Sequence, residues 1–328
     1  MKSIVVFGGS GFIGSRLVAR LSAAGCQVRV PTRRRERAKH LLTLPTVDVV
    51  QIDTFDTATL ERLLHGQQAA VNLVGILHDR TGRPYGPGFA RAHVRLAQNL
   101  AAACVASGAR RLLHMSALGA DSNGPSMYLR SKGDGETAIR AQQGLLWTIL
   151  RPSVVFGPGD TFLNAFARVQ RLLPVIPLGG AHARFAPVYV GDVVQAAMHA
   201  LIGPQADATI GRTYELTGPK VYTLAELVKL AGVWAGVNQG RGRPVIPLPA
   251  PLARLVAFGM ELAPGEPLMS RDNLDSMRVP SVAGTELPGF AAELGVAHPH
   301  SLEVIAPDYL GGLDPQTRYD QLRATAGR

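Results

Sequence analysis

The sequence predicts an α/β fold, a Rossmann-type doubly wound parallel sheet with a smaller C-terminal domain. Two observations support this prediction. Short β-prone apolar runs alternate with segments of helical periodicity through the first half of the chain. A glycine-rich turn directly follows the first of these runs and opens the first helical segment. Alternating strands and helices indicate βαβ units, which cover both faces of a parallel sheet with helices.

The alternation of strands and helices predicts six strands before Pro152, after which glycine and proline become frequent. The strands are expected at 4–7, 27–30, 47–52, 69–74, 111–115 and 145–150, and the most regular helices at 12–24, 89–107 and 127–142. Later helices are expected at 190–201 and 224–234, and a strand at 212–216 is expected to rejoin the main sheet.

This pattern divides the chain. We expect a dinucleotide-binding Rossmann domain at 1–156, to which 190–217 returns. A smaller domain, formed by 157–189 and 218–310, is expected to cover the cofactor cleft. Residues 311–328 lack apolar periodicity and are expected to form a loose tail.

The composition is that of a globular protein and gives no sign of a membrane-spanning helix. The chain has 328 residues, 46% of them hydrophobic and 18% charged, which is ordinary for a globular protein. No apolar run reaches the roughly 18–20 residues that span a bilayer. The apolar stretch 250–262 contains Arg254 and Glu261, so it predicts a core or amphipathic helix, with membrane-surface association as the alternative.

The net charge of +10 is compatible with a plain basic surface or with attraction to phosphates, anionic lipid or an acidic partner. No nucleic-acid-binding module is recognisable, so nucleic acid is not an expected partner. Cys26 and Cys104 lie in apolar surroundings and are interpreted as buried thiols in a reducing compartment. His298 and His300 lack accompanying ligands, so a loop is favoured over a metal site, and no metal is expected.

The first residues read as a strand rather than as a cleavable leader. We therefore expect a cytoplasmic protein, or one that is peripheral to the inner face of a membrane.

The glycine-rich turn is the strongest motif. Gly8, Gly11 and Gly14 are spaced three apart between the first strand and the first helix. Glycine permits the tight turn and lets backbone amides approach a pyrophosphate, while the helix N-terminus supplies free N–H groups. The sequence therefore predicts a dinucleotide site here, to which the intervening side chains also contribute: Ser10, Phe12 and Ile13.

The second strand favours NADP(H) over NAD(H). An NAD site usually has an Asp or Glu at this strand end, whereas this chain has Thr32, Arg33 and Arg34. Arginines suit a 2′-phosphate, although a solvated basic helix start would look the same. Asp53 is placed to accept from the adenine amino group. After the fourth strand, 72–75 should line the ribose, with Asn72, Val74 and Gly75 as contacts.

A tyrosine and a lysine share a helix face after the fifth strand. Tyr128 and Lys132 are four residues apart, one helical turn. A nearby ammonium is expected to lower the pKa of the phenol and so prepare a proton donor or acceptor for hydride chemistry. Lys132 could also hold the ribose hydroxyls. Ser116, which ends the fifth strand, would be the third catalytic residue and orient substrate.

The glycine turn, the Tyr-x-x-x-Lys pair, the segment 150–159 and the segment 187–193 together resemble the extended short-chain dehydrogenase/reductase superfamily, whose members are NAD-dependent epimerases and dehydratases among others. In that superfamily the stretch after the sixth strand lines the nicotinamide. The resemblance therefore implies cofactor contacts for Pro152 and Val154.

Five shorter segments resemble one atypical branch: 114–118, 128–132, 160–164, 247–249 and 270–274. This branch includes the nucleotide-binding alpha-subcomplex accessory subunit of mitochondrial respiratory complex I. The resemblance implies a bound NADP(H) and an association with a protein complex or a membrane surface.

The same resemblance reveals two departures from the usual pattern. Only twelve positions separate Ser116 from Tyr128, where typical members have a longer loop, and His93 stands where they carry a structural asparagine. Whether the chain is an enzyme therefore stays open. The first hypothesis is a mainly structural cofactor, and the alternative is an active NADP-dependent reductase or nucleotide-sugar epimerase/dehydratase. A third is a sensor of the NADP(H) ratio.

Overall fold

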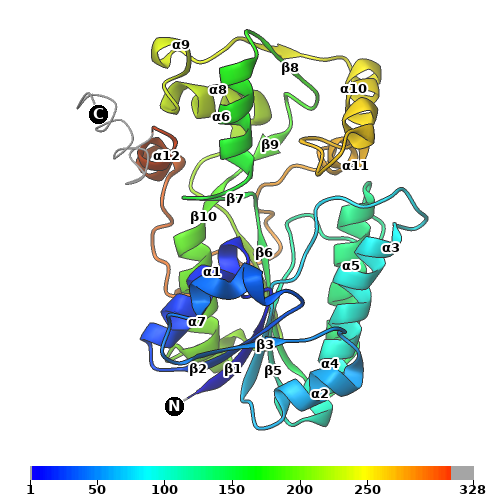
Figure 1. Cartoon of the computed structure of the whole chain (residues 1–328), viewed down its shortest axis with the longest axis vertical. Helices are drawn as coiled ribbons and strands as arrows, with labels where there is room; N and C mark the ends of the chain where they lie inside the picture. The colour runs from blue at the N-terminus through cyan, green and yellow to red at the C-terminus, as the bar shows by residue number, and fades with distance from the viewer. Residues whose placement is uncertain (1, 312–328) are drawn as a thin grey trace. The chain divides into compact units, whose positions relative to one another are not determined.

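The computed structural model describes residues 2–311, which form two compact units (Figure 1). The first unit comprises residues 2–152, 191–216 and 283–298, and the second comprises 153–190, 217–282 and 299–311. The expected tail at 311–328 lies outside the described residues, apart from Gly311.

The first unit is built on a seven-stranded sheet with the order β11-β6-β5-β4-β1-β2-β3. Every pairing in it is parallel. The predicted doubly wound fold is therefore confirmed, and so is the return of the late strand, which pairs with β6. The strands are β1 (Ser3–Phe7), β2 (Gln27–Thr32), β3 (Val47–Gln51), β4 (Ala69–Asn72), β5 (Arg111–Met115), β6 (Leu146–Pro152) and β11 (Arg212–Leu216).

Helices cover both faces of this sheet (Figure 1). On one face α2, α4 and α5 enclose a core that includes Phe7, Leu60, Leu100, Leu112 and Ile139. On the other face lie α1 and α7, which are joined by a hydrogen bond between Arg20 and Gln195. The helices are α1 (Phe12–Ala23), α2 (Thr57–Leu64), α3 (Pro87–Phe89), α4 (Leu96–Ala106), α5 (Met127–Ala141) and α7 (Val190–Ile202).

The helix predicted at 89–107 is not a single α-helix. Residues Ala90–Arg95 form a π-helical segment between α3 and α4, and it contains His93. Such segments are rare and occur frequently at functional sites. Periodicity in the sequence does not distinguish one widened turn from regular α-helix, which explains the difference.

The second unit combines short two-stranded ribbons with helices. The ribbons pair β7 (Val155–Phe156) with β10 (Val188–Tyr189), β9 (Arg184–Phe185) with β12 (Tyr222–Thr223), and β8 (Ile176–Leu178) with β13 (Val245–Pro247). The helices are α6 (Phe162–Leu172), α8 (Leu224–Trp234), α9 (Val237–Gly240), α10 (Ala250–Leu262), α11 (Arg271–Ser276) and α12 (Leu302–Leu310). Their core includes Phe166, Ile176, Leu227 and Ala306.

Candidate functional site

The carboxyl ends of the parallel strands bring most of the predicted site residues of the first unit to one edge of its sheet. The chain runs from β1 to β2 on one side and returns to β4 on the other. In open α/β sheets, ligands bind at this reversal of strand order. A Cβ atom placed on Gly8 would lie 3.1 Å from the backbone nitrogen of Val74, so the loops after β1 and β4 are in contact.

The glycine turn is a tight backbone cradle. Gly8 has a φ of +78°, and Gly11 donates from its amide to the Gly8 carbonyl at 3.0 Å. A Cβ atom on Gly14 would lie 2.2 Å from the same carbonyl oxygen, so only glycine fits there. Gly11 is the N-cap of α1, and no side chain caps the helix. The first-turn amides of α1 therefore lack a side-chain acceptor, and Ser10, Phe12 and Ile13 flank them half-buried.

Basic residues follow β2. Thr32 is buried, and its hydroxyl accepts from the Arg34 amide at 3.3 Å and donates to the Arg34 carbonyl at 3.1 Å, which fixes the turn. Arg33 and Arg34 are exposed. Asp53, beyond the end of β3, is also exposed.

The loop after β4 is held by two buried polar groups. The Asn72 side chain accepts from the Val74 amide at 3.2 Å and donates to Nδ1 of His114 at 3.1 Å. Gly75 lies beside the helices, since a Cβ on it would be 3.4 Å from Nζ of Lys132 and 3.7 Å from Nε2 of His93. The structure therefore brings the β4 loop, the π-helical segment and α5 together.

His93 connects these three elements. Its Nε2 accepts from the Ile76 amide at 3.1 Å, and its Nδ1 lies 2.8 Å from Oγ of Ser131, which in turn donates to the Tyr128 carbonyl. Because Nε2 is an acceptor, the proton is assigned to Nδ1. Burial, with the charge of Lys132, lowers the pKa of His93 to about 2, so the ring is neutral. His93, which stands where typical members of the superfamily carry an asparagine, therefore links the β4 loop to α5 through a fixed imidazole.

Lys132 is buried and donates from Nζ to the Met115 carbonyl at 3.1 Å. Burial lowers its pKa to about 8, against the opposing charge of Glu136. Nζ lies 6.0 Å from the centre of the Tyr128 ring. The predicted pair is therefore on one face of α5, next to the predicted Ser116.

The expected effect of the lysine on the tyrosine is wrong in direction. Burial raises the pKa of Tyr128 to about 12, whereas we predicted a lowered value. The reason is that burial penalises the charged phenolate. Tyr128 is consequently a protonated phenol throughout the neutral range.

Two buried polar atoms beside Lys132 have no protein partner in the part of the chain that the structure describes: Oγ of Ser116 and Nε2 of His114. Both side chains are almost fully buried, at 3% and 2% exposed. Burial lowers the pKa of His114 to about 3, so its ring is neutral and Nε2 is a donor. These orphaned groups and the glycine cradle are consistent with a polar ligand at this edge. His114 was missed as a site residue, although a histidine within an otherwise apolar buried strand was the available signal.

Two further predicted contacts belong to different units. Pro152 ends β6 in the first unit, and Val154 lies in the second, where its carbonyl accepts from the Val188 amide at 3.0 Å. No group of three or more His, Cys, Asp or Glu residues that could hold a metal is present within residues 2–311.

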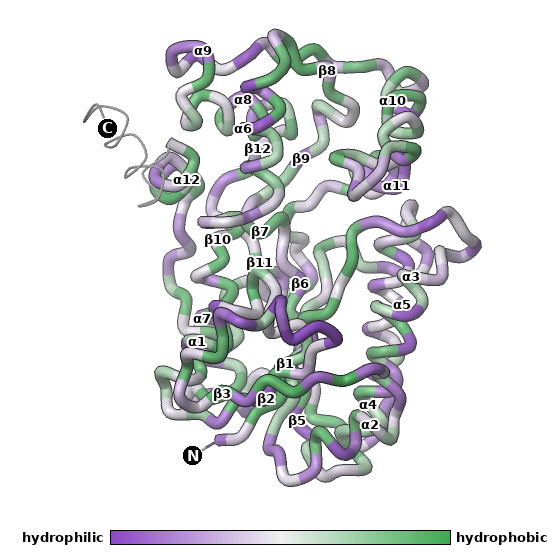
Figure 2. The backbone as a smooth tube through the Cα atoms, viewed as in Figure 1, coloured by the Kyte–Doolittle hydropathy of each residue, from purple (hydrophilic) through white to green (hydrophobic). Residues whose placement is uncertain are grey.

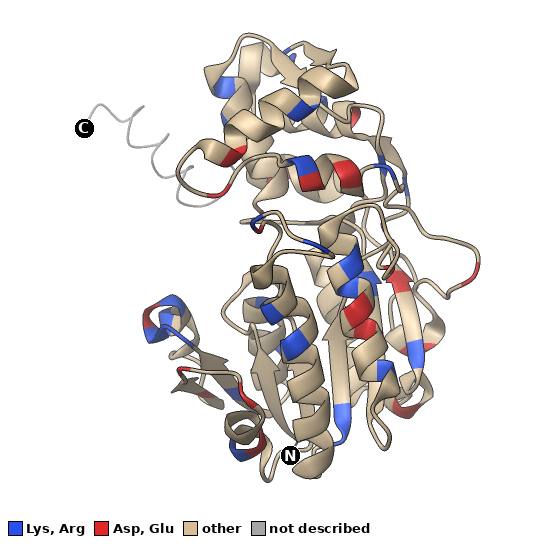
Figure 3. Ribbon diagram, turned by 90° about the vertical axis from the view of Figure 1, so that its right-hand side faces the viewer, with Lys and Arg blue, Asp and Glu red and all other residues tan. Residues whose placement is uncertain are grey.

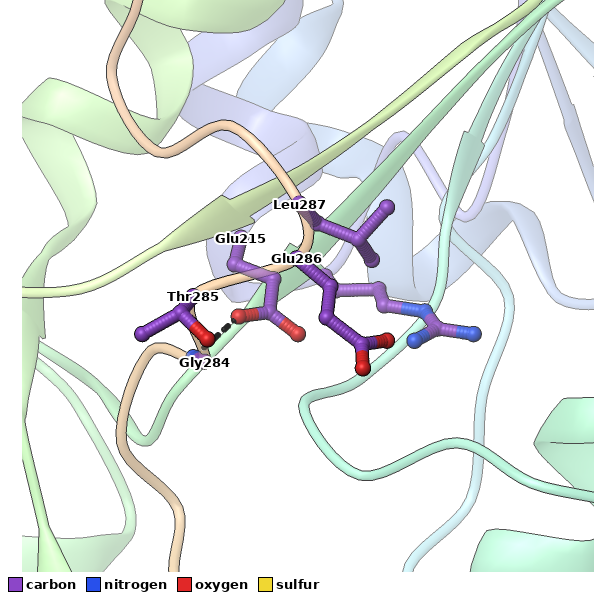
Figure 4. Close-up of a pocket in the computed structure, with 6 residues that line it drawn as sticks. Glu215, Gly284, Thr285, Glu286 and Leu287 are labelled. Atoms are coloured by element: carbon purple, nitrogen blue, oxygen red, sulfur yellow. Dashed lines mark hydrogen bonds between the residues drawn. The ribbon is translucent and has the colours of Figure 1, made fainter.

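A separate pocket of about 290 Å³ lies in the first unit, by the ends of β6 and β11 (Figure 4). Glu215 and Glu286 line it with Arg151, and the Glu215 carboxylate accepts from the Gly284 amide at 2.6 Å. The guanidinium group of Arg151 is already bound bidentately by Glu136, at 2.7 and 2.8 Å. None of the predicted site residues lines this pocket.

Comparison with known proteins identifies the family of the chain. The model of the NAD dependent epimerase/dehydratase family matches residues 4–216. NADH dehydrogenase (ubiquinone) 1 alpha subcomplex subunit 9 of Mus musculus mitochondria is 31% identical over 309 residues, which cover 91% of this chain and 77% of that protein. The NADH-ubiquinone oxidoreductase 40 kDa subunit of Neurospora crassa is 28% identical over 98% of this chain and 82% of its own length.

Among solved structures, UDP-glucuronic acid 4-epimerase from Bacillus cereus, in complex with UDP-glucuronic acid and NAD, superposes with a TM-score of 0.67. It is 18% identical and the match covers 95% of this chain and 99% of the epimerase, which supports the fold. The resemblance predicted from the short motifs is confirmed by the sequence relatives.

Proposed function

We propose, for a chain that belongs to the NAD dependent epimerase/dehydratase family, that it binds NADP(H) on its first unit and keeps it mainly as a structural component. The observation that carries the proposal is the glycine cradle, which lies where the strand order reverses. The N-terminus of α1 begins beside it and is not capped by any side chain. Backbone amides and the helix dipole favour a pyrophosphate at such a place.

The other contacts follow from the strand ends. Thr32, Arg33 and Arg34 would hold the 2′-phosphate, and Asp53 the adenine amino group. The ribose next to the nicotinamide would lie against the β4 loop and Lys132, whose buried ammonium is a hydrogen-bond donor. When bound, the nicotinamide supplies a hydride donor or acceptor. The remaining proposed contacts of the first unit are Asn72, Val74 and Gly75 to the ribose, and Pro152 to the nicotinamide.

The surroundings of Tyr128 support the proposal that NADP(H) is retained without being oxidised or reduced. Its pKa is raised to about 12, Lys132 is engaged by a backbone carbonyl, and Ser116 is 3% exposed. Two relatives bear the names of respiratory-complex subunits. We therefore propose that the protein acts as an accessory component of a larger assembly, peripheral to a membrane. No helix among the described residues is long and apolar enough to span a bilayer.

The first test is mass spectrometry of the nucleotide released from the purified protein, followed by incubation with isotope-labelled NADPH. We expect NADP(H) at close to one equivalent, with exchange much slower than the hours of a preparation. Release of NAD(H) would contradict the NADP preference, and exchange within seconds would contradict a structural role.

Replacing Arg33 and Arg34 together by serine should weaken NADPH binding about 100-fold and leave NADH binding unchanged. A charge-assisted hydrogen bond contributes about 1.5 kcal/mol, or roughly tenfold per arginine. Calorimetric titration of the nucleotide-free protein measures both affinities. Arg110→Ser, which removes an exposed arginine that precedes β5, is the matched control. Equal losses for NADPH and NADH would show that the two arginines do not contact the 2′-phosphate.

The second candidate function is an active NADP-dependent reductase or a nucleotide-sugar epimerase/dehydratase. The observation that favours it is the buried Lys132 one turn from Tyr128, because a protonated phenol beside an ammonium group can donate to a carbonyl oxygen.

Tyr128→Phe distinguishes the two functions. On the structural proposal, wild type oxidises no NADPH with a panel of carbonyl compounds and converts no nucleotide-sugar, and Tyr128→Phe retains its full cofactor content. On the enzymatic alternative, wild type turns over and Tyr128→Phe loses about 100-fold or more of the rate. Stopped-flow absorbance of NADPH and chromatography of the sugar products provide the two measurements.

A further inference from the structure

The helix α10 of the second unit is apolar on its solvent face as well as on its core face. Ala253 and Ala257 are buried, at 4% and 1% exposed, whereas Leu252, Leu255 and Leu262 on the other side are 46%, 65% and 71% exposed. Hydrophobic residues, green in Figure 2, dominate the helix. A helix that is apolar nearly all round is normally buried, so this solvent face is expected to be covered in the working protein.

Apolar side chains of two neighbouring elements are exposed as well. At the end of α6, Leu172 and Leu173 are 81% and 42% exposed, and Ile246 on β13 is 52% exposed. A groove of about 80 Å³ lies between the core face of α10 and the end of α6, since Leu173 lines it together with Ala253 and Val256. Every residue that lines the groove is uncharged. We call this surface the apolar tip, defined by Leu172, Leu173, Ile246, Leu252, Leu255 and Leu262.

Positive charge outweighs negative charge around the apolar tip. No aspartate or glutamate occurs between Phe162 and Val190 or between Leu227 and Met260. Figure 3 shows lysines and arginines in blue. Five exposed basic side chains of these two segments form no ion pair with the described residues: Arg168, Arg171, Arg184, Lys229 and Arg241.

At the other edge of α10 the charges are already neutralised. Arg254 pairs with Asp275 at 2.8 Å, and Arg271 pairs with Glu261 at 2.7 Å. Glu266, which follows α10, is exposed and has no ion pair with the described residues, so the charge that remains available around the apolar tip is positive on balance.

We propose that the apolar tip docks on the surface of a bilayer containing anionic phospholipid. Exposed leucines next to arginines are the combination that inserts at the level of the headgroups, where the apolar side chains reach the acyl boundary and the cations meet phosphates. If a second copy of the chain docked on this face, the basic residues of the two copies would face one another. Like-charge repulsion therefore disfavours self-association through this face. This docking rests on the membrane-peripheral role proposed above, and it can be tested apart from the cofactor because none of the residues of the apolar tip is among those proposed to hold NADP(H).

Flotation of the full chain with vesicles tests the docking. The probes are vesicles of phosphatidylcholine alone and of equimolar phosphatidylcholine and phosphatidylglycerol. Wild type should float with the anionic vesicles and lose binding as NaCl is raised. The pair Leu172→Ser and Leu255→Ser should weaken binding by about tenfold for each leucine. The pair Arg171→Ser and Arg241→Ser should weaken it about 25-fold, because each basic residue contributes about fivefold near an anionic surface.

Two variants are the controls. Val304→Ser removes an apolar side chain that is 63% exposed elsewhere in the second unit, and Arg110→Ser removes an exposed arginine that precedes β5 in the first unit. Both should bind anionic vesicles as wild type does, and all variants should keep the wild-type unfolding transition and nucleotide content. The proposal is overturned if wild type ignores anionic vesicles, or if the tip variants bind as tightly as the controls. It is also overturned if the leucine variants instead dissociate a dimer or a protein complex while vesicle binding is absent.

Discussion

Replacing Gly14 by alanine is expected to reduce NADP(H) affinity at least about 100-fold and to lower the free energy of unfolding by about 1–3 kcal/mol. The added Cβ would lie 2.2 Å from the Gly8 carbonyl oxygen and 2.7 Å from Cα of Gly9. Both neighbours are backbone atoms, so the whole turn must move rather than one flexible side chain. Overpacking of this kind costs about 1–3 kcal/mol.

The larger loss in affinity arises because the displaced backbone carries the proposed donors to the pyrophosphate. Losing two hydrogen bonds to a charged group at about 1.5 kcal/mol each reduces binding about 100-fold. Titration of nucleotide-free protein with NADPH measures the affinity, and urea unfolding measures the stability.

Gly259→Ala is the matched control, because a Cβ at Gly259 meets no atom within 4 Å. Alanine in that helix should leave NADPH affinity unchanged and stabilise by about 0.5–1 kcal/mol. If Gly14→Ala bound NADPH as tightly as Gly259→Ala, the glycine turn would not be the pyrophosphate site.

The fold could be predicted because its signals are local. Each strand of the main sheet is a short apolar run, and the turn from Gly8 to Gly14 identifies the first βα unit without any tertiary information. The segment 283–298 shows the limit. It belongs to the first unit, where the Pro288 carbonyl accepts from the Glu215 amide, yet it is irregular and its neighbours are distant in sequence. Nothing periodic in such a segment indicates what it packs against.

The sequence indicated which side chains lie close together at the candidate site better than it indicated their pKa values. Spacing places Tyr128 and Lys132 on one helix face, and the structure brings them together with the β4 loop. The direction of the tyrosine pKa depends on burial and on where the ammonium group points, neither of which spacing gives. His114 and the π-helical setting of His93 were also missed, because both depend on contacts between strands and helices that are far apart in sequence.

Substituting glutamine for Glu136 is expected to lower the free energy of unfolding by about 3–5 kcal/mol. Glu136 is 0% exposed and lies one turn beyond Lys132 on α5. Its carboxylate binds Arg151 at 2.7 and 2.8 Å and Arg140 at 2.7 Å, and the Arg151 side chain is only 15% exposed. Burial alone would lower the pKa of Arg151, but hydrogen bonding and charge from Glu136 raise it.

Glutamine keeps the shape but removes the charge, leaving the buried guanidinium group of Arg151 without its hydrogen-bonded counter-charge, while Glu215 and Asp121 act on it only through longer-range charge. Breaking a buried pair in this way costs about 3–5 kcal/mol. Glu303→Gln is the matched control, because Glu303 pairs with Lys220 at an exposed position, with side chains 40% and 62% exposed. Such a pair contributes at most about 1 kcal/mol. Urea unfolding followed by circular dichroism compares the two variants.

Glu136→Gln is also expected to change the protonation of Lys132 at the proposed cofactor site. The charge of Glu136 opposes the lowering of the Lys132 pKa by burial, so its removal should lower that pKa further below about 8. Lys132 then loses its proton nearer neutral pH, and the ammonium donor proposed for the ribose is lost with it. NADPH affinity in Glu136→Gln should therefore fall on going from pH 6 to pH 8 more than it does in wild type or in Glu303→Gln. If the three pH profiles coincide, Glu136 stabilises α5 against the sheet without tuning Lys132.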